Sequence, residues 1–264
     1  MEQIVLNNSN KILMTNSYIF NGDNFDNSEL FFEIESNQNV LILFLNIHKD
    51  IKIIFNIKDH AHAKYSFFQE NASNMFIKGN VGKGSELICY FADFVKGDIK
   101  LETDIHLVGE EARCIWNLAS LTKDNDKKEF DVSIYHDMKK TYCEINNYGV
   151  ARDSSKLLFS GICKIENGSH ESVAHQNSKI MVFDENSDAI AKPILKIDDN
   201  DIEASHAAVV GKISDDHMFY MTSRGLSLKE ARELITYGYL KPILNGFNDD
   251  ELQNHINSLI ERGV

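Results

Sequence analysis

The sequence predicts a mainly β protein that carries a short helical region at its C-terminal end. Apolar and polar residues alternate in much of the chain before residue 214, which is typical of strands with one buried side. Helix-capping residues and helical periodicity follow only after that point. The chain is therefore expected to consist of a β core, residues 1–213, and a C-terminal helical region, residues 214–264.

The clearest predicted strand is Ile99–Leu107, where apolar residues and one threonine alternate with charged residues and a histidine. This pattern predicts a strand with one buried side and one side in water. The strand pattern begins by about Phe31. Further strands are predicted, in chain order, at Val40–Ile47, Ile51–Ile57, Leu87–Phe94, Cys114–Leu121, Phe130–Ile134, Leu157–Ile165 and Ile180–Phe183.

Polar breaks fall at nearly even spacing in the later part of the β core, at residues 153–155, 167–169, 185–187 and 199–201. Such spacing suits a solenoid, in which similar strand-turn units stack and bury each other's apolar sides. An antiparallel sandwich also consists of short, evenly spaced strands. The residue pattern alone favours the sandwich, because the spacing rests on only four breaks.

Three helices are predicted in the C-terminal region. Gly225 can end a first helix, from about Asp215 to Arg224, because glycine readily adopts the left-handed conformation of a C-cap. A second helix, from Leu228 to about Tyr239, begins at a capping box formed by Ser227 and Glu230.

The last helix is predicted to begin at about Asp249, with Asn248 as its cap and Gly263 at its end. Its apolar residues recur at helical spacing, as they do in the second helix. We expect these apolar stripes to pack on the β core, on each other or on a partner protein.

Composition argues against several classes of function. The net charge of -13 opposes binding to nucleic acid, because that binding needs Lys and Arg to neutralise phosphates. The longest apolar run, Val40–Leu45, is too short to cross a membrane, and the N-terminus lacks the basic and apolar parts of a secretory signal. We therefore expect a cytoplasmic protein. Its four cysteines form no Cys-x-x-Cys pair and are expected to be buried, reduced thiols.

Motifs for common enzymes are missing from the sequence. Val81–Ser85 looks superficially like a P-loop but lacks its first glycine, so we expect no ATP site in this chain. His60 and His62 would share one face of a strand and suggest a metal-dependent, cupin-like β-barrel enzyme as an alternative function. The acidic residue that a cupin needs three or four positions later is not there, since the next one is Glu70.

Two strings near the junction of the predicted regions identify a family. Glu203–Ile213, with His206 at its centre, and Phe219–Leu226 resemble the signature of the SufB/SufD family of iron-sulfur cluster assembly scaffolds, and the SufD branch fits best. Smaller matches cover Gln176–Asn177, Lys192–Ile197 and Tyr237–Pro242. The resemblance implies a right-handed parallel β-helix-like core and a scaffold subunit that is not itself an enzyme.

The resemblance also implies partners. A Suf-type ATPase, similar to SufC, is expected to dock on the C-terminal helices, and a SufB-like subunit or a second copy of this chain is expected to pair edge to edge with the last strands. Longer members of the family have an N-terminal helical region that this sequence does not show, which suggests a compact version of the scaffold. The expected partner-binding residues are Arg224, Leu228, Ala231, Leu234, Ile235 and Tyr239.

His206 matches a family histidine that is implicated in cluster formation between two scaffold subunits. The resemblance therefore implies a transient iron-sulfur cluster shared with a partner, and reduced flavin in some complexes. Ala204 and Met221 stand where relatives have cysteines, and Ala207 replaces a glycine, so the partner would have to supply the thiolate. Two alternatives stay open: His206 forms only hydrogen bonds in the last β unit, or the chain is a purely structural Suf partner.

Overall fold

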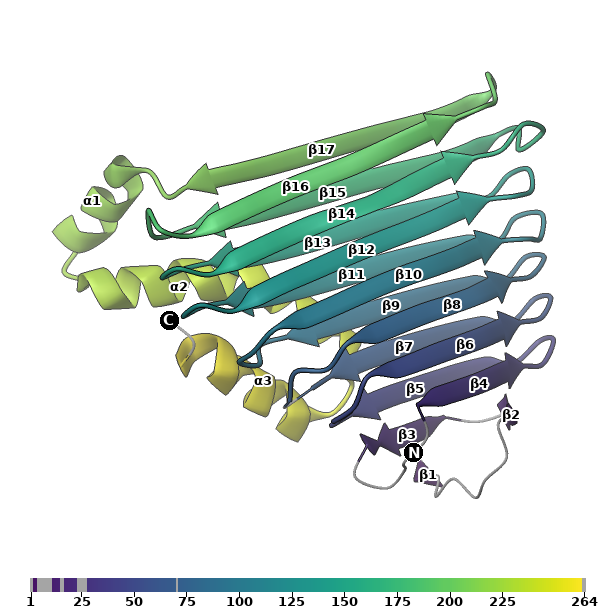
Figure 1. Ribbon diagram of the computed structural model, residues 1–264, viewed down its shortest axis with the longest axis horizontal. Helices are drawn as coiled ribbons and strands as arrows, with labels where there is room; N and C mark the ends of the chain where they lie inside the picture. The colour runs from purple at the N-terminus through teal and green to yellow at the C-terminus, as the bar shows by residue number, and fades with distance from the viewer. Residues whose placement is uncertain (1, 4–10, 15–16, 23–27, 70, 263–264) are drawn as a thin grey trace.

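The chain folds into a parallel β-helix with helices along one side (Figure 1). This computed structural model describes residues 2–3, 11–14, 17–22, 28–69 and 71–262. All strand pairs are parallel, so the expected β-helix is confirmed and the antiparallel sandwich is wrong. The sandwich fails because each strand pairs with the strand two positions along the chain, and its immediate neighbour lies in the other sheet.

Two sheets form the walls of the β-helix. The nine-stranded sheet has the order β1-β3-β5-β7-β9-β11-β13-β15-β17, and the eight-stranded sheet has the order β16-β14-β12-β10-β8-β6-β4-β2. The odd-numbered strands are Glu2–Gln3, Tyr18–Asn21, Asn39–Leu45, His62–Phe68, Glu86–Asp93, Arg113–Thr122, Tyr142–Ala151, Ser172–Val182 and Ile202–Lys212. The even-numbered strands are Lys11–Met14, Glu29–Ile34, Ile51–Ile57, Met75–Val81, Ile99–Leu107, Lys127–His136, Lys156–Ile165 and Asp188–Ile197.

The four polar breaks are the turns between β13 and β17, so the evenly spaced units are real. Each break ends one strand, and a full turn of the β-helix takes two strands.

At one corner, residues with positive φ stack above one another, and the amide of each donates to a carbonyl in the next turn. Lys140, for example, donates to His170 O at 2.8 Å. The stacked residues are Asn37, His60, Gly84, Glu111, Lys140 and Glu171.

Alternation in the strands fills the interior of the β-helix. In β10, Ile99, Leu101 and Ile105 are buried while Lys100 and Glu102 are exposed, as the sequence predicts. Equivalent residues of neighbouring turns stack in register; Phe44, Phe67 and Phe91 form one such aromatic column, with ring centroids 4.4 and 5.6 Å apart. All four cysteines are buried free thiols, which confirms that expectation.

Three α-helices and one 3-10 helix follow the last strand: α1 (Asp215–Ser223), α2 (Leu228–Leu240), η2 (Lys241–Gly246) and α3 (Asp250–Arg262). Gly225 follows the C-cap of α1 with φ of 97°, and Ser227 and Glu230 form the predicted capping box of α2.

The predicted cap of the last helix is wrong. Asp249 Oδ1 accepts from the Leu252 amide at 2.8 Å, while the Asn248 side chain accepts from Lys64 Nζ at 3.1 Å. Asn248 is thus occupied by a contact with the β core, and α3 begins one residue later. Gly263, predicted as the helix end, lies outside the described residues.

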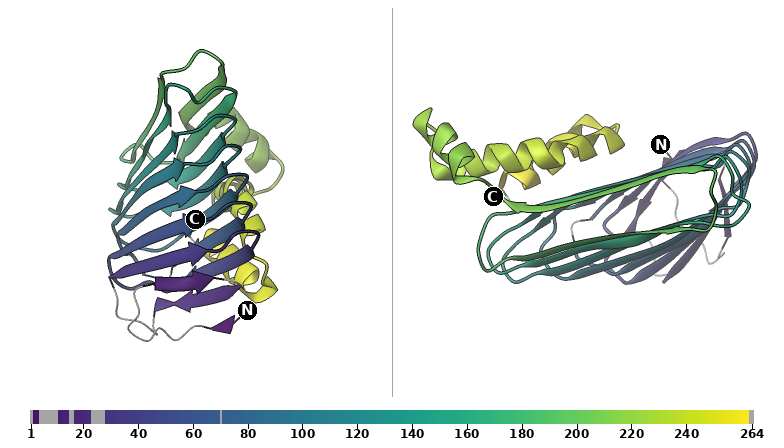
Figure 2. Two further views of the ribbon diagram at one scale, coloured as in Figure 1. Left: turned by 90° about the vertical axis from the view of Figure 1, so that its right-hand side faces the viewer. Right: turned by 90° about the horizontal axis from the view of Figure 1, so that it is seen from above.

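The helices α2, η2 and α3 run back along the outer face of the nine-stranded sheet (Figure 2). We call this segment, residues 228–262, the strap. It buries a second apolar cluster against strands from β5 to β13, separate from the interior of the β-helix. The cluster contains Leu43, Phe68, Ala92, Phe94, Ala119, Leu121, Val150, Leu240, Ile243, Leu244, Phe247, Ile256 and Ile260. Within the described residues, no helix combines the length and apolar character needed to cross a membrane.

Candidate functional site

The last turn of the β-helix is its most exposed part. β17 pairs with β15 and β16 pairs with β14, and among the described residues neither strand has a partner on its other side. Free backbone groups along such an edge can pair with another chain. Large apolar side chains are also exposed in these two strands: Ile190, Ile194, Ile197, Val209 and Val210.

His206 lies in the middle of β17 and is exposed. It is on the same face of the strand as Ile202 and Ala204, which pack against the interior core. Its register partner in β15 is Gln176, which is only 4% exposed. The imidazole therefore lies at the open mouth of the β-helix interior rather than on an outer wall.

The interior becomes polar beneath His206. A small cavity there is lined by Asn147, Ser160, Gln176 and Ser178 together with apolar residues. Gln176 Nε2 donates to Ile194 O at 3.3 Å, but Gln176 Oε1 and Asn147 Oδ1 are buried and find no hydrogen-bond partner among the described residues. These two oxygens can accept hydrogen bonds from groups that enter the mouth of the interior.

The donor set of this chain alone does not form a cluster cage. Within the described residues, no group of three or more His, Cys, Asp or Glu side chains is placed to hold a metal ion. Ala204 is half-buried in β17 beside His206, and Met221 lies in α1, so neither provides a thiolate. A cluster at this mouth would need ligands from a second protein.

Helix α1 follows β17 at the open end, and α2 comes after it (Figure 1). Both helices expose large apolar side chains. Phe219 is 74% exposed in α1, and Leu228 and Leu234 are each 56% exposed in α2. Arg224 is exposed as well, and its guanidinium lies 5.1 Å from the centre of the Tyr220 ring.

The other expected partner-binding residues contribute differently. Ala231 is fully buried and therefore cannot contact a partner in this conformation. Ile235 is half-buried, and the ring of Tyr239 packs edge-on against Tyr148 of β13 at 5.8 Å. The accessible surface thus consists of Arg224, Leu228 and Leu234, extended by the aromatic residues of α1.

The cupin-like metal site is wrong. His60 is in a turn with φ of 58°, whereas His62 is the first residue of β7, so the two residues do not share one face of a strand. His62 Nδ1 lies 3.7 Å from Glu86 Oε2 and is exposed. The prediction assumed that both histidines lie in one strand. His60 instead lies in the turn before β7, where the alternation of a strand does not apply.

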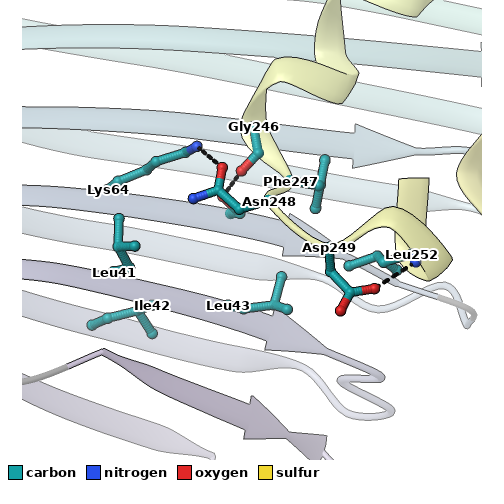
Figure 3. A pocket seen from close by; sticks show the side chains of 10 residues that line it. Leu41, Ile42, Leu43, Lys64, Gly246, Phe247, Asn248, Asp249 and Leu252 are labelled. Atoms are coloured by element: carbon teal, nitrogen blue, oxygen red, sulfur yellow. Dashed lines mark hydrogen bonds between the residues drawn. The ribbon is translucent and has the colours of Figure 1, made fainter. Parts of the chain in front are cut away.

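A pocket lies where the strap meets β5 and β7, and sequence reasoning missed it (Figure 3). Leu41, Leu43, Phe247 and Leu252 contribute its apolar lining, and Lys64 lies at its rim. Lys64 Nζ donates to Asn245 O and Asn248 Oδ1, and partial burial lowers the pKa of this lysine. No sequence signal marks this pocket, because its two walls are nearly two hundred residues apart in the chain.

Comparison with known proteins identifies the family. The family described as "SUF system FeS cluster assembly, SufBD core domain" matches residues 46–239, which is most of the chain. The chain belongs to the SufBD family of iron-sulfur cluster assembly proteins. The matched range covers the β-helix from the end of β5 onward, the open mouth at His206 and helices α1 and most of α2.

Named relatives are similar to this chain over only part of their own length. SufD of Bacillus subtilis is 33% identical over 168 residues, which cover 64% of this chain and 38% of that protein. SufD of Escherichia coli is 20% identical over 211 residues, covering 78% of this chain and 49% of that protein. A SufBD family protein of Mycobacterium leprae is 23% identical over 196 residues, which are 22% of its length. The chain thus resembles SufD and spans less than half of these relatives.

Proposed function

We propose that this SufD-like chain is a non-enzymatic scaffold subunit of a Suf-type iron-sulfur cluster assembly complex. The observation that carries the proposal is the open end of the β-helix, where two strand edges have no partner among the described residues. His206 faces the interior there, as do the exposed apolar residues Ile197 and Val210. Such an end fits a second subunit that adds strands to β16 or β17 and buries Ile197 and Val210. That subunit is a SufB-like protein or a second copy of this chain.

Sedimentation of the purified chain, alone and with the SufB-like protein of its own organism, tests this interface. Val210→Asp places a charge on the interior-facing side of β17 and is expected to abolish association, because the carboxylate would lose its water in the interface. Val108→Asp is the matched control, since Val108 is a similarly exposed valine at a corner far from β17. Equal association of the two variants would rule out the open end as the interface.

Helix α2 supports a second contact, with a Suf-type ATPase similar to SufC. Leu228 and Leu234 are exposed on α2, which is anchored to the β core through Leu240. We expect Leu234→Asp to weaken co-purification of the ATPase, while Met138→Asp, a change at an exposed apolar residue in a distant corner, leaves it intact. If Leu234→Asp retains the ATPase as well as the control does, this docking site is wrong.

His206 is proposed to contribute one ligand to an iron-sulfur cluster that forms transiently between the two subunits. A neutral imidazole suits iron, and the partner must supply thiolates, because Ala204 and Met221 stand where relatives have cysteine. Reduced flavin, which the family resemblance alone suggests, would likewise bind in the assembled complex.

Anaerobic reconstitution of the assembled complex tests His206. We expect His206→Ala to lower the iron and sulfide bound per complex, whereas His62→Ala, which changes another exposed histidine, has no effect. Sedimentation of both variants shows whether the complex still forms. If His206→Ala assembles normally and binds as much iron and sulfide as the parent, the chain is instead a purely structural Suf partner.

A further inference from the structure

All four cysteines of the chain lie inside the β-helix, although they are far apart in the sequence. Cys89, Cys114 and Cys143 lie on β9, β11 and β13 of one sheet, and Cys163 lies on β14 of the other. Cys114 and Cys143 are register partners in neighbouring strands. The thiols are therefore collected along one stretch of the interior, spread over three successive turns.

Two of these thiols face each other across the interior. Cys143 Sγ and Cys163 Sγ are 3.3 Å apart, and both side chains are fully buried. A disulfide bond is about 2.05 Å long, so bonding requires the two sulfurs to approach by only about 1 Å. No other cysteine pair in the described part of the chain makes so short a contact.

The surroundings favour slow, selective chemistry at this pair. The hydrogen bond to Cys163 and burial both raise the pKa of Cys143, so its thiolate is scarce at neutral pH. Above Cys143, towards the open end, its register column continues with Ala174 and Ala204. These small side chains lie between the thiol and the mouth of the interior. Both sulfurs are buried, so a small oxidant such as hydrogen peroxide is expected to reach them through local opening of this end of the fold.

We propose that Cys143 and Cys163 form a reversible disulfide that joins the two sheets of the β-helix when the chain meets hydrogen peroxide. One thiolate attacks a peroxide oxygen, the O–O bond breaks, and hydroxide leaves to give a sulfenic acid. The second thiolate then attacks the sulfenyl sulfur, the S–S bond forms, and a second hydroxide leaves. Both hydroxides take up the protons of the two thiols as water, and peroxide accepts the two electrons. Excess thiol reductant reverses the bond.

This bond would act on the part of the fold that carries the open end. β13 and β14 lie directly beneath β15 and β16, so the cross-link fixes the separation of the two sheets one turn below these strands, and β13 is two strands below β17, which carries His206. The inference does not depend on the proposed function, because it rests on two side chains of the isolated chain and on the chemistry of thiols.

Peptide mapping of the full, folded chain tests the proposal. The reduced protein is treated with hydrogen peroxide, quenched with catalase, and alkylated with iodoacetamide in denaturant without reductant. We expect the number of alkylated cysteines to fall from four to two, with one linked peptide pair that contains Cys143 and Cys163. Dithiothreitol should restore all four alkylated residues.

Variants and a denatured sample sharpen the assignment. Cys163→Ser is expected to leave every remaining cysteine alkylated, whereas Cys89→Ser, its matched control, should form the linked pair as the parent does. Oxidation in urea should give mixed pairings, because unfolding removes the geometric selection. The map of the unsubstituted chain is decisive, since it requires no variant to fold. Recovery of Cys143 and Cys163 as free thiols, or a dominant Cys114–Cys143 link, would overturn the proposal.

Discussion

At the scale of single residues, burial determines the chemistry of His136. Its side chain is fully buried, and its Nδ1 lies 2.7 Å from Thr141 Oγ1. The Thr141 hydroxyl also lies 3.0 Å from Met138 O and 2.8 Å from Ser172 Oγ, while Nε2 of His136 has no hydrogen-bond partner among the described residues. Burial disfavours the imidazolium form and lowers the pKa of His136 from 6.5 to about 4.

This histidine should make the protein sensitive to mild acid. The unfolded chain binds a proton at His136 near pH 6.5, while the folded chain resists it until about pH 4. Its contribution to the free energy of unfolding is therefore complete above pH 6.5 and falls by ~3 kcal/mol as the pH drops to 4.

We expect His136→Gln to flatten the loss of stability between pH 6.5 and 4, as measured by urea unfolding across that range. Carboxylates also titrate near its lower end, so the comparison is between variant and parent at each pH. A matched control is His62→Gln, at an exposed histidine. An unchanged slope in the His136 variant, with a native circular dichroism spectrum, would contradict the assignment.

At the scale of elements, the strap shows how a helix is attached to a β-helix. The apolar sides of α2, η2 and α3 lie on the outer face of the nine-stranded sheet, and polar contacts fix their position. Ser66 Oγ donates to Gly246 O at 2.7 Å, and Lys64 Nζ donates to Asn248 Oδ1. Both donors are outward-facing residues of β7, and without the strap their side chains would be in water.

Ile256 should be an anchor of the strap, because it is fully buried in the cluster that α3 forms with the sheet. Truncation of such a side chain leaves a cavity and lowers the free energy of unfolding by about 3 kcal/mol. We expect that loss for Ile256→Ala, measured by denaturant unfolding. Leu234→Ala, at the exposed side of α2, should cost about 0.5 kcal/mol or less. Comparable losses in both variants would show that the strap packs differently.

Local signals in the sequence predicted some elements well and missed others for physical reasons. The capping box at Ser227 was found because it depends only on neighbouring residues. β15 was predicted only at its end, because polar Gln176 and Ser178 point inward, so apolar and polar residues do not alternate there. The cap at Asp249 was missed because Asn248 is engaged by Lys64, a contact between distant parts of the chain.

At the scale of the whole molecule, stability should decrease towards the open end. Strands such as β11 and β13 pair on both sides, while β17 pairs only with β15 among the described residues. We therefore expect the amides of β17 to exchange with deuterium faster than those of β13, as measured by mass spectrometry. Addition of the proposed partner should slow exchange in β17 and leave β13 unchanged. Equal protection of both strands in the isolated chain would contradict this view of the last turn.

The candidate site could be predicted only in part from the residues. The strings around His206 located it on the last strand, but its position at the mouth of the interior depends on the register with Gln176, which no local pattern encodes. The exposed apolar residues of β16, such as Ile190 and Ile194, were also missed. In the sequence they resemble the buried residues of any strand. In the structure they alternate with Ala189, Ala191 and Leu195, which pack on the interior core, so Ile190 and Ile194 lie on the outer face of β16.

The strap also has a consequence for the number of turns in the β-helix. Its apolar cluster takes residues from successive strands of one sheet, including Leu43 of β5, Phe68 of β7 and Val150 of β13. Neighbouring strands are spaced by about 4.8 Å, so an added or deleted turn would shift every later contact by that step. The length of the strap therefore matches one number of turns: a β-helix with one turn more or fewer would misalign these apolar contacts.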